Sequence, residues 1–97
     1  MDREHLIVVT YDIRDAKRWK RVFRIMNGYG QWIQLSVFQC RLTRRRRVEL
    51  AAKLQEVIKY GEDHVVLIDV GPAGTVQPSI ESLGRTLPQM ERRATVV

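Results

Sequence analysis

Residues 6–12 read Leu-Ile-Val-Val-Thr-Tyr-Asp, an apolar run that ends in a single acid. A short continuous run rich in β-branched residues is typical of a strand buried in the middle of a sheet. We therefore expect a central strand that delivers Asp12 to the edge of the sheet. The residues that follow are basic: Lys17, Arg18, Lys20 and Arg21. An acid beside a cluster of cations suggests phosphate chemistry.

Hydrophobic periodicity beyond this run predicts two helices. The first has an apolar face spaced at i, i+3, i+4 and i+7, made of Trp19, Val22, Phe23 and Met26. The second has a buried stripe made of Leu50, Ala51, Leu54, Val57 and Ile58. Asp15 and Thr43 are the expected N-caps, because a short polar side chain can accept a hydrogen bond from a free backbone N–H.

The remaining patterns predict strands. Residues 31–42 alternate with a period of two and exceed a typical strand, so we expect two strands that meet near Leu35 and Ser36. Residues 64–70 form a second apolar run, expected in the middle of the sheet. This order predicts an α+β ferredoxin-like plait (βαββαβ), in which both helices cover one face of an antiparallel sheet. We assign this domain to residues 1–71.

Residues 72–97 differ in character and form a C-terminal extension. Prolines and glycines prevent a long helix there, at Pro72, Gly74, Pro78, Gly84 and Pro88. Two short segments, 79–84 and 95–97, keep strand character. Because the last four residues are mostly apolar, we expect the extension to pack on a sheet, either in this chain or in a partner chain.

Composition narrows the class of partner. The 97 residues fit one domain, and 17 Lys and Arg against 11 Asp and Glu give a net charge of +6. Such a balance favours DNA, RNA or an anionic membrane face. No apolar stretch approaches the roughly 18 residues of a membrane span, and the first residues are too polar for a signal peptide. We expect a cytoplasmic protein with no membrane partner.

Cysteine and histidine provide no metal or disulfide framework. Cys40 is the single cysteine, and its strand pattern favours a buried packing role over a nucleophile. His5 and His64 lie far apart in sequence and show no zinc spacing. Neither histidine is assigned a catalytic role from the sequence.

Four strings of residues, at 9–15, 17–22, 28–30 and 34–38, resemble the CRISPR-associated protein 2 family, the small subunit of the CRISPR spacer-acquisition complex. The resemblance covers residues 6–70 in order. It implies a homodimer in which sheet faces meet and C-terminal strands can cross to the other subunit. It also implies that Asp12 of both chains converges near the twofold axis, where Mg²⁺ or Mn²⁺ can bind for endonuclease hydrolysis of RNA or DNA. Members of the family also bridge two dimers of the CRISPR integrase and hold spacer DNA.

The resemblance assigns further residues to this site. Tyr11 and Ser36 are candidates to hydrogen-bond a phosphate or water, and Phe38 is a candidate to stack on a base, although a core position suits Phe38 as well. Trp32 and Gln39 depart from the family pattern, where a basic residue and an acid are common. These departures concern the expected catalytic site and leave the expected fold unchanged.

The hydrolase hypothesis depends on the second chain. One carboxylate is a poor magnesium site, because the ion takes about six oxygens, and twofold symmetry would supply a second. Asp12 has a competing structural interpretation as a helix cap, which Asp15 fits better because the helix begins immediately after it. The sequence leaves open whether the chain is an enzyme.

Basic residues give a second, independent hypothesis of non-specific binding to a nucleic-acid backbone. The candidates are Arg14, Lys17, Arg18, Lys20, Arg21, Arg24, Arg44, Arg45, Arg46 and Arg47. A solvated helix face explains such runs equally well. Two further alternatives are a toxin-like ribonuclease on the same fold and a non-catalytic nucleic-acid-binding module. An RNA-recognition module is disfavoured, because its paired aromatic motifs are missing.

Overall fold

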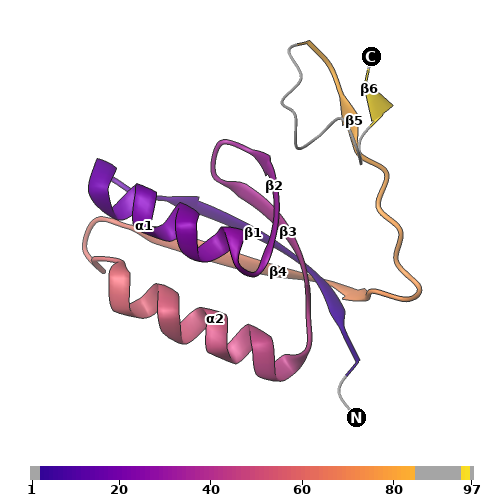
Figure 1. Ribbon diagram of the computed structural model, residues 1–97, viewed down its shortest axis with the longest axis horizontal. Coiled ribbons are helices and arrows are strands. Elements are labelled where there is room, and N and C mark those ends of the chain that lie inside the picture. The colour runs from indigo at the N-terminus through magenta and orange to yellow at the C-terminus, as the bar shows by residue number, and fades with distance from the viewer. Residues whose placement is uncertain (1–2, 85–94, 97) are drawn as a thin grey trace.

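The computed structural model describes residues 3–84 and 95–96. Its first six elements are β1 (His5–Asp12), α1 (Ala16–Asn27), β2 (Gly30–Gln34), β3 (Val37–Leu42), α2 (Arg44–Val57) and β4 (His64–Pro72). The four strands form one antiparallel sheet in the order β2-β3-β1-β4. Both helices lie on the same face of this sheet (Figure 1). The predicted ferredoxin-like plait is confirmed.

The central strand β1 is the one that residues 6–12 predict. It pairs with β3 on one side and with β4 on the other. Its buried residues Ile7, Val9 and Tyr11 belong to the core under the helices. Because side chains alternate along a strand, Thr10 and Asp12 lie on the opposite, helix-free face.

The core forms where the predicted helix faces meet the sheet. Val22 and Met26 of α1 are fully buried, and Leu50, Leu54 and Val57 of α2 are buried with them. Two aromatic side chains of α1, Trp19 and Phe23, stack with their ring centroids 5.2 Å apart. Both predicted apolar faces point to the core, although Trp19, Phe23, Ala51 and Ile58 are only partly buried.

Both predicted N-caps are present. The Asp15 carboxylate accepts a hydrogen bond from the Arg18 backbone N–H at 3.0 Å. Thr43 Oγ1 accepts one from the Arg46 N–H at 3.2 Å. Each cap satisfies a backbone donor that the first helical turn leaves without a partner.

The predicted bend between two strands is a tight hairpin turn. Leu35 has a positive φ of 38°, and the Trp32 indole N–H donates to the Leu35 carbonyl at 2.8 Å. At the start of β2, a Cβ on Gly30 would lie 2.7 Å from the Gln39 carbonyl oxygen and closer still to Cys40 Sγ. Glycine is therefore needed where β2 approaches β3.

The predicted central position of residues 64–70 is wrong, because β4 lies at an edge of the sheet. Its apolar side chains divide between two faces. Val65 and Leu67 pack against the core, whereas Ile68 is 47% exposed. An apolar run is typical of a central strand, but it also occurs in an edge strand that carries apolar side chains on both faces.

Two short strands lie in the extension, β5 (Glu81–Ser82) and β6 (Thr95–Val96). They pair in parallel as a separate two-stranded sheet (Figure 1). Residues 85–94 and 97 of the extension lie outside the described residues. Packing of the extension on a partner's sheet therefore stays a prediction.

Candidate functional site

Asp12 is the last residue of β1 and is exposed. Its register partner on β4 is His64, which is also exposed. Cross-strand partners carry their side chains on the same face, so these two groups share the helix-free side of the sheet. Among the residues that the structure describes, no hydrogen bond or ion pair engages the Asp12 carboxylate. The fold thus leaves this acid available to a ligand.

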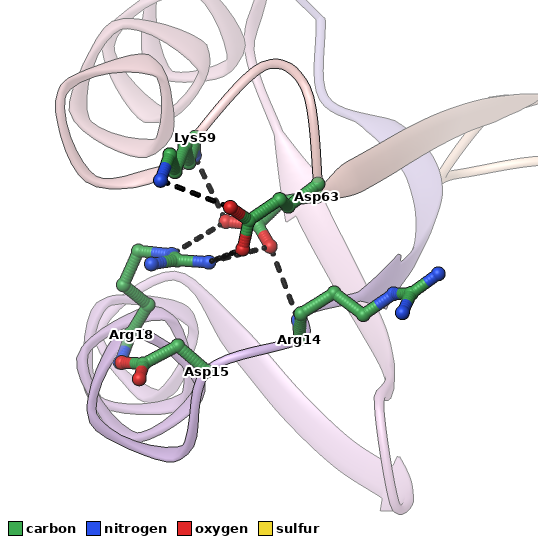
Figure 2. Close-up of polar contacts among 6 residues, drawn as sticks. Arg14, Asp15, Arg18, Lys59 and Asp63 are labelled. Atoms are coloured by element: carbon green, nitrogen blue, oxygen red, sulfur yellow. Dashed lines mark hydrogen bonds and ion pairs between the residues drawn. The ribbon is translucent and has the colours of Figure 1, made fainter.

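A second acid, Asp63, holds the backbone around Asp12 in place. Its carboxylate accepts the Arg14 N–H at 3.1 Å and the Lys59 N–H at 2.8 Å. It also accepts two hydrogen bonds from the Arg18 guanidinium, at 2.7 Å from Nε and 3.2 Å from Nη2. Figure 2 shows these contacts converging on one side chain from α1, the loop before it and the end of α2.

The surroundings of Asp63 stabilise its charged form. The side chain is fully buried, and the Arg18 guanidinium, helped by the Lys59 and Arg14 N–H groups, holds its pKa well below the ordinary value. Sequence reasoning missed this residue. Lys59 is four residues away, but Arg18 and Arg14 lie 45 and 49 residues away, so no local pattern indicates the whole cluster.

Arg18 is among the residues predicted to bind nucleic acid, and in this fold acids of its own chain engage it. Its guanidinium is partly buried and pairs with Asp63 and, at 3.2 Å, with Glu62. Arg14 contributes its backbone N–H to the same cluster, while its side chain extends away from it (Figure 2). The remaining predicted cations of α1 are exposed: Lys17, Lys20, Arg21 and Arg24.

The four arginines that open α2 do not form one continuous surface. Arg44 and Arg47 line a pocket beside the start of β1. Arg46 turns toward α1, where its guanidinium carbon lies 4.3 Å from the centre of the Tyr29 ring. Arg45 is exposed and lines neither site. The arginines of this run therefore lie in different surroundings around α2.

The structure also places the three predicted supporting residues. Tyr11 and Phe38 are buried on the helix-covered face, and their ring centroids lie 6.3 Å apart. Asp12 lies on the other face, so contacts of Tyr11 or Phe38 with a ligand held by Asp12 stay a prediction that this geometry does not support. Ser36 is half-buried, and its Oγ accepts the Trp19 indole N–H at 2.9 Å.

The described residues contain no group of three or more His, Cys, Asp or Glu side chains that could hold a metal ion. The Asp12 side chain by itself offers one exposed carboxylate, and carboxylate oxygens are the hard ligands that Mg²⁺ prefers. That ion is commonly held by one or two carboxylates, with water and phosphate oxygens completing its shell. Asp12 therefore fits half of a magnesium site that a second chain would complete.

The part of the chain that the structure describes has no helix with the length and apolarity needed to cross a membrane.

Comparison with known proteins agrees with this arrangement. A sequence model of the family described as CRISPR associated protein Cas2 matches residues 5–75. The chain is 48% identical over 94 residues to CRISPR-associated endoribonuclease Cas2 of Geobacter sulfurreducens, covering 97% of this chain and 99% of that protein. It is 51% identical over 94 residues to CRISPR-associated endoribonuclease Cas2 1 of Rhodospirillum rubrum, covering 97% of this chain and 92% of that protein.

A solved structure supports the same assignment. The crystal structure of Streptococcus pyogenes Cas2 superposes with a TM-score of 0.65 at 30% identity, covering 68% of this chain and 86% of that one. Sequence and fold thus agree across the plait. The chain belongs to the CRISPR-associated protein 2 (Cas2) family.

Proposed function

We propose that this Cas2 protein acts in CRISPR adaptation as a homodimer whose two Asp12 carboxylates form one metal-dependent site for phosphodiester hydrolysis. The observation that carries the proposal is an exposed acid without a protein partner, among the described residues, at the border of an open sheet face. RNA is the proposed substrate, because the Geobacter sulfurreducens and Rhodospirillum rubrum relatives are endoribonucleases by name.

The helix-free face supports the dimer. An antiparallel sheet that faces water on one side normally alternates apolar and polar residues. Here the side chains opposite the core are apolar at Val8, Val37, Val66 and Ile68. A second copy of the same face would bury them, and a twofold axis across the sheet would bring its Asp12 with it.

The residues of this chain would act on the phosphate in distinct ways. Asp12 supplies carboxylate oxygens from the end of a rigid central strand, and the Asp63 cluster fixes the loop that follows it. The Arg14 side chain, two residues after Asp12, offers a cation for the scissile phosphate. When bound, Mg²⁺ would polarise a water molecule and offset charge on the phosphate.

His64 is the first residue to test as a proton acceptor. The sequence gives no reason to assign it a role, but the strand register places it opposite Asp12. Imidazole is a common general base, and a group on the same face as the carboxylate is suitably placed to act on its water.

Asp12→Asn tests the hydrolase proposal. We expect Mg²⁺-dependent cleavage of RNA to fall at least about 100-fold, because the charge that holds the metal is absent. Light scattering should still report a dimer of unchanged mass. Equal cleavage by variant and wild type, prepared in parallel, would assign the activity to another site or to a contaminant.

Ile68→Asp tests the dimer separately. A charge placed on the proposed interface should give a folded monomer that has lost cleavage although its own Asp12 is intact. Lys20→Asp, on an exposed part of α1, is the matched control and should leave the mass unchanged. A dimer that persists in Ile68→Asp would place the interface elsewhere.

The exposed cations of α1 favour a second role. Lys17, Lys20, Arg21 and Arg24 have no ion-pair partner among the described residues, so they are free to approach a DNA backbone. We propose that they hold spacer DNA while the dimer bridges integrase subunits. Neutralising one cation that binds a phosphate should lower the salt dependence of duplex binding by roughly 0.9 log units per log unit of salt. An unchanged slope in a variant lacking all four cations would count against this role.

A further inference from the structure

A basic pocket lies at the opposite end of β1 from Asp12. Its volume is about 460 Å³, within the roughly 300–1,000 Å³ of small-molecule sites. Three arginines line it: Arg3, Arg44 and Arg47. The eight residues of β1 separate it from Asp12 by roughly 23 Å along the strand. The pocket is thus distinct from the proposed hydrolytic site and does not depend on it.

A histidine held by an acid forms part of the wall. His5 Nδ1 lies 2.9 and 3.0 Å from the two carboxylate oxygens of Asp69. Asp69 also accepts the Gly71 N–H at 2.9 Å. Its hydrogen bond with His5, and then that with Gly71, lower the pKa of Asp69, so this acid stays charged. An ionised carboxylate accepts the Nδ1 proton, which fixes the orientation of the ring.

The charges around this pocket do not cancel. Asp69 is the single acid among its described lining residues, and one oxygen of that acid lies 3.8 Å from the Arg47 guanidinium. Three arginines against one carboxylate leave a formal excess of two positive charges with His5 neutral. Arg3 and Arg44 have no ion-pair partner among the residues described. Their guanidinium groups can therefore donate to an incoming anion.

We propose that this pocket binds a phosphate monoester, carried either by the end of a nucleic-acid strand or by a free nucleotide. A monoester has a charge of about −1.5 to −2 at pH 7, which matches the excess of the pocket better than the single charge of a diester. The concave shape also suits a projecting terminal group, whereas an internal phosphate lies along a convex backbone. Arg44 and Arg47 donate hydrogen bonds to the phosphate oxygens.

Binding of a short single strand with a 5′ phosphate, compared with the same strand bearing a 5′ hydroxyl, tests the proposal. Fluorescence anisotropy at fixed salt should show at least about tenfold tighter binding of the phosphorylated strand. The Arg44→Gln/Arg47→Gln variant should bind both strands equally. Arg45→Gln is the matched control for the single substitution Arg44→Gln: it removes one charge from the same run outside the pocket and should keep the preference.

Two further measurements sharpen the result. Arg44→Gln alone should also lose most of the preference, and it breaks no ion pair within the described fold, so misfolding of the double variant would not hide the effect. Competition by AMP would identify a free nucleotide as ligand, whereas displacement only by phosphorylated strands would identify a strand end. Equal binding of the two strands by the wild type, or a preference that survives in Arg44→Gln/Arg47→Gln, would overturn the proposal.

Discussion

Asp12 and Asp63 lie at the same end of the sheet and have opposite surroundings. Asp12 pairs in register with His64, the residue that follows Asp63. Asp63 is buried and receives four hydrogen bonds, whereas Asp12 is exposed and has no partner among the described residues. The acid that anchors the fold, Asp63, is engaged in hydrogen bonds within the chain. The acid that it leaves free is the one available to a ligand.

The comparison also limits what a shifted pKa means. Perturbed acids often mark functional sites, but structural ion pairs perturb pKa values as well. Among the residues that the structure describes, the carboxyl with the strongly lowered pKa is Asp63, which Arg18, Lys59 and Arg14 surround. Its shift therefore reports anchoring of the loop between β1 and α1.

Asp63→Asn should give the largest change in stability. In one orientation the amide NH2 would face Arg18 Nε and the Lys59 N–H, and in the other it would face Arg18 Nη2 and the Arg14 N–H. Either way the guanidinium would lose its buried charge partner. We expect the melting temperature to fall by more than about 5 °C. Thermal unfolding followed by circular dichroism measures this.

Glu62→Gln is the matched control for this variant. This substitution removes one negative charge from the residue that precedes Asp63. The Glu62 carboxylate is exposed and pairs with Arg18 and Lys59. Exposed pairs contribute little, so the melting temperature should change only slightly. An equal fall in melting temperature for the two variants would show that the number of negative charges, rather than the buried Asp63 carboxylate, stabilises this end of the sheet.

Acidification should weaken the anchor that Asp63 provides. Because the folded state lowers the pKa of Asp63, its contribution is present above the unfolded value, near pH 4, and is lost as pH falls below it. Urea unfolding between pH 7 and pH 3 should show a steeper fall in stability for the wild type than for Asp63→Asn. A curve for Asp63→Asn as steep as that of the wild type would contradict the anchoring role of the Asp63 carboxylate.

Tyr11→Phe should have the smallest effect. Tyr11 precedes Asp12 but lies on the other face, and its hydroxyl is buried without a hydrogen-bond partner among the described residues. Burial raises its pKa to about 12. Removing the hydroxyl should leave stability unchanged or raise it by up to about 1 kcal/mol, and RNA cleavage should persist. A loss of cleavage would restore the predicted role of Tyr11 at the phosphate.

The sequence predicts the parts of this fold that local chemistry determines. The apolar run 6–12, the caps Asp15 and Thr43 and the bend at Leu35 are all where their neighbours in sequence indicate. Each depends on spacing or on a hydrogen bond to a residue a few positions away. The exposed position of Asp12 follows from the same strand pattern.

Features that depend on distant contacts could not be predicted in this way. The anchoring role of Asp63 requires Arg14 and Arg18, which lie 49 and 45 residues away in sequence and come close only in the folded chain. The edge position of β4 depends on strand order rather than on composition. The division of the arginines of α2 between two pockets depends on how that helix sits against β1 and α1.

The stoichiometry of Mn²⁺ binding tests most directly the claim that two copies of Asp12 make one site. Titration of the wild-type protein, followed by electron paramagnetic resonance, should show one tightly bound ion for every two chains. Asp12→Asn should show none while remaining dimeric. One ion per chain, or full binding by Asp12→Asn, would contradict the account.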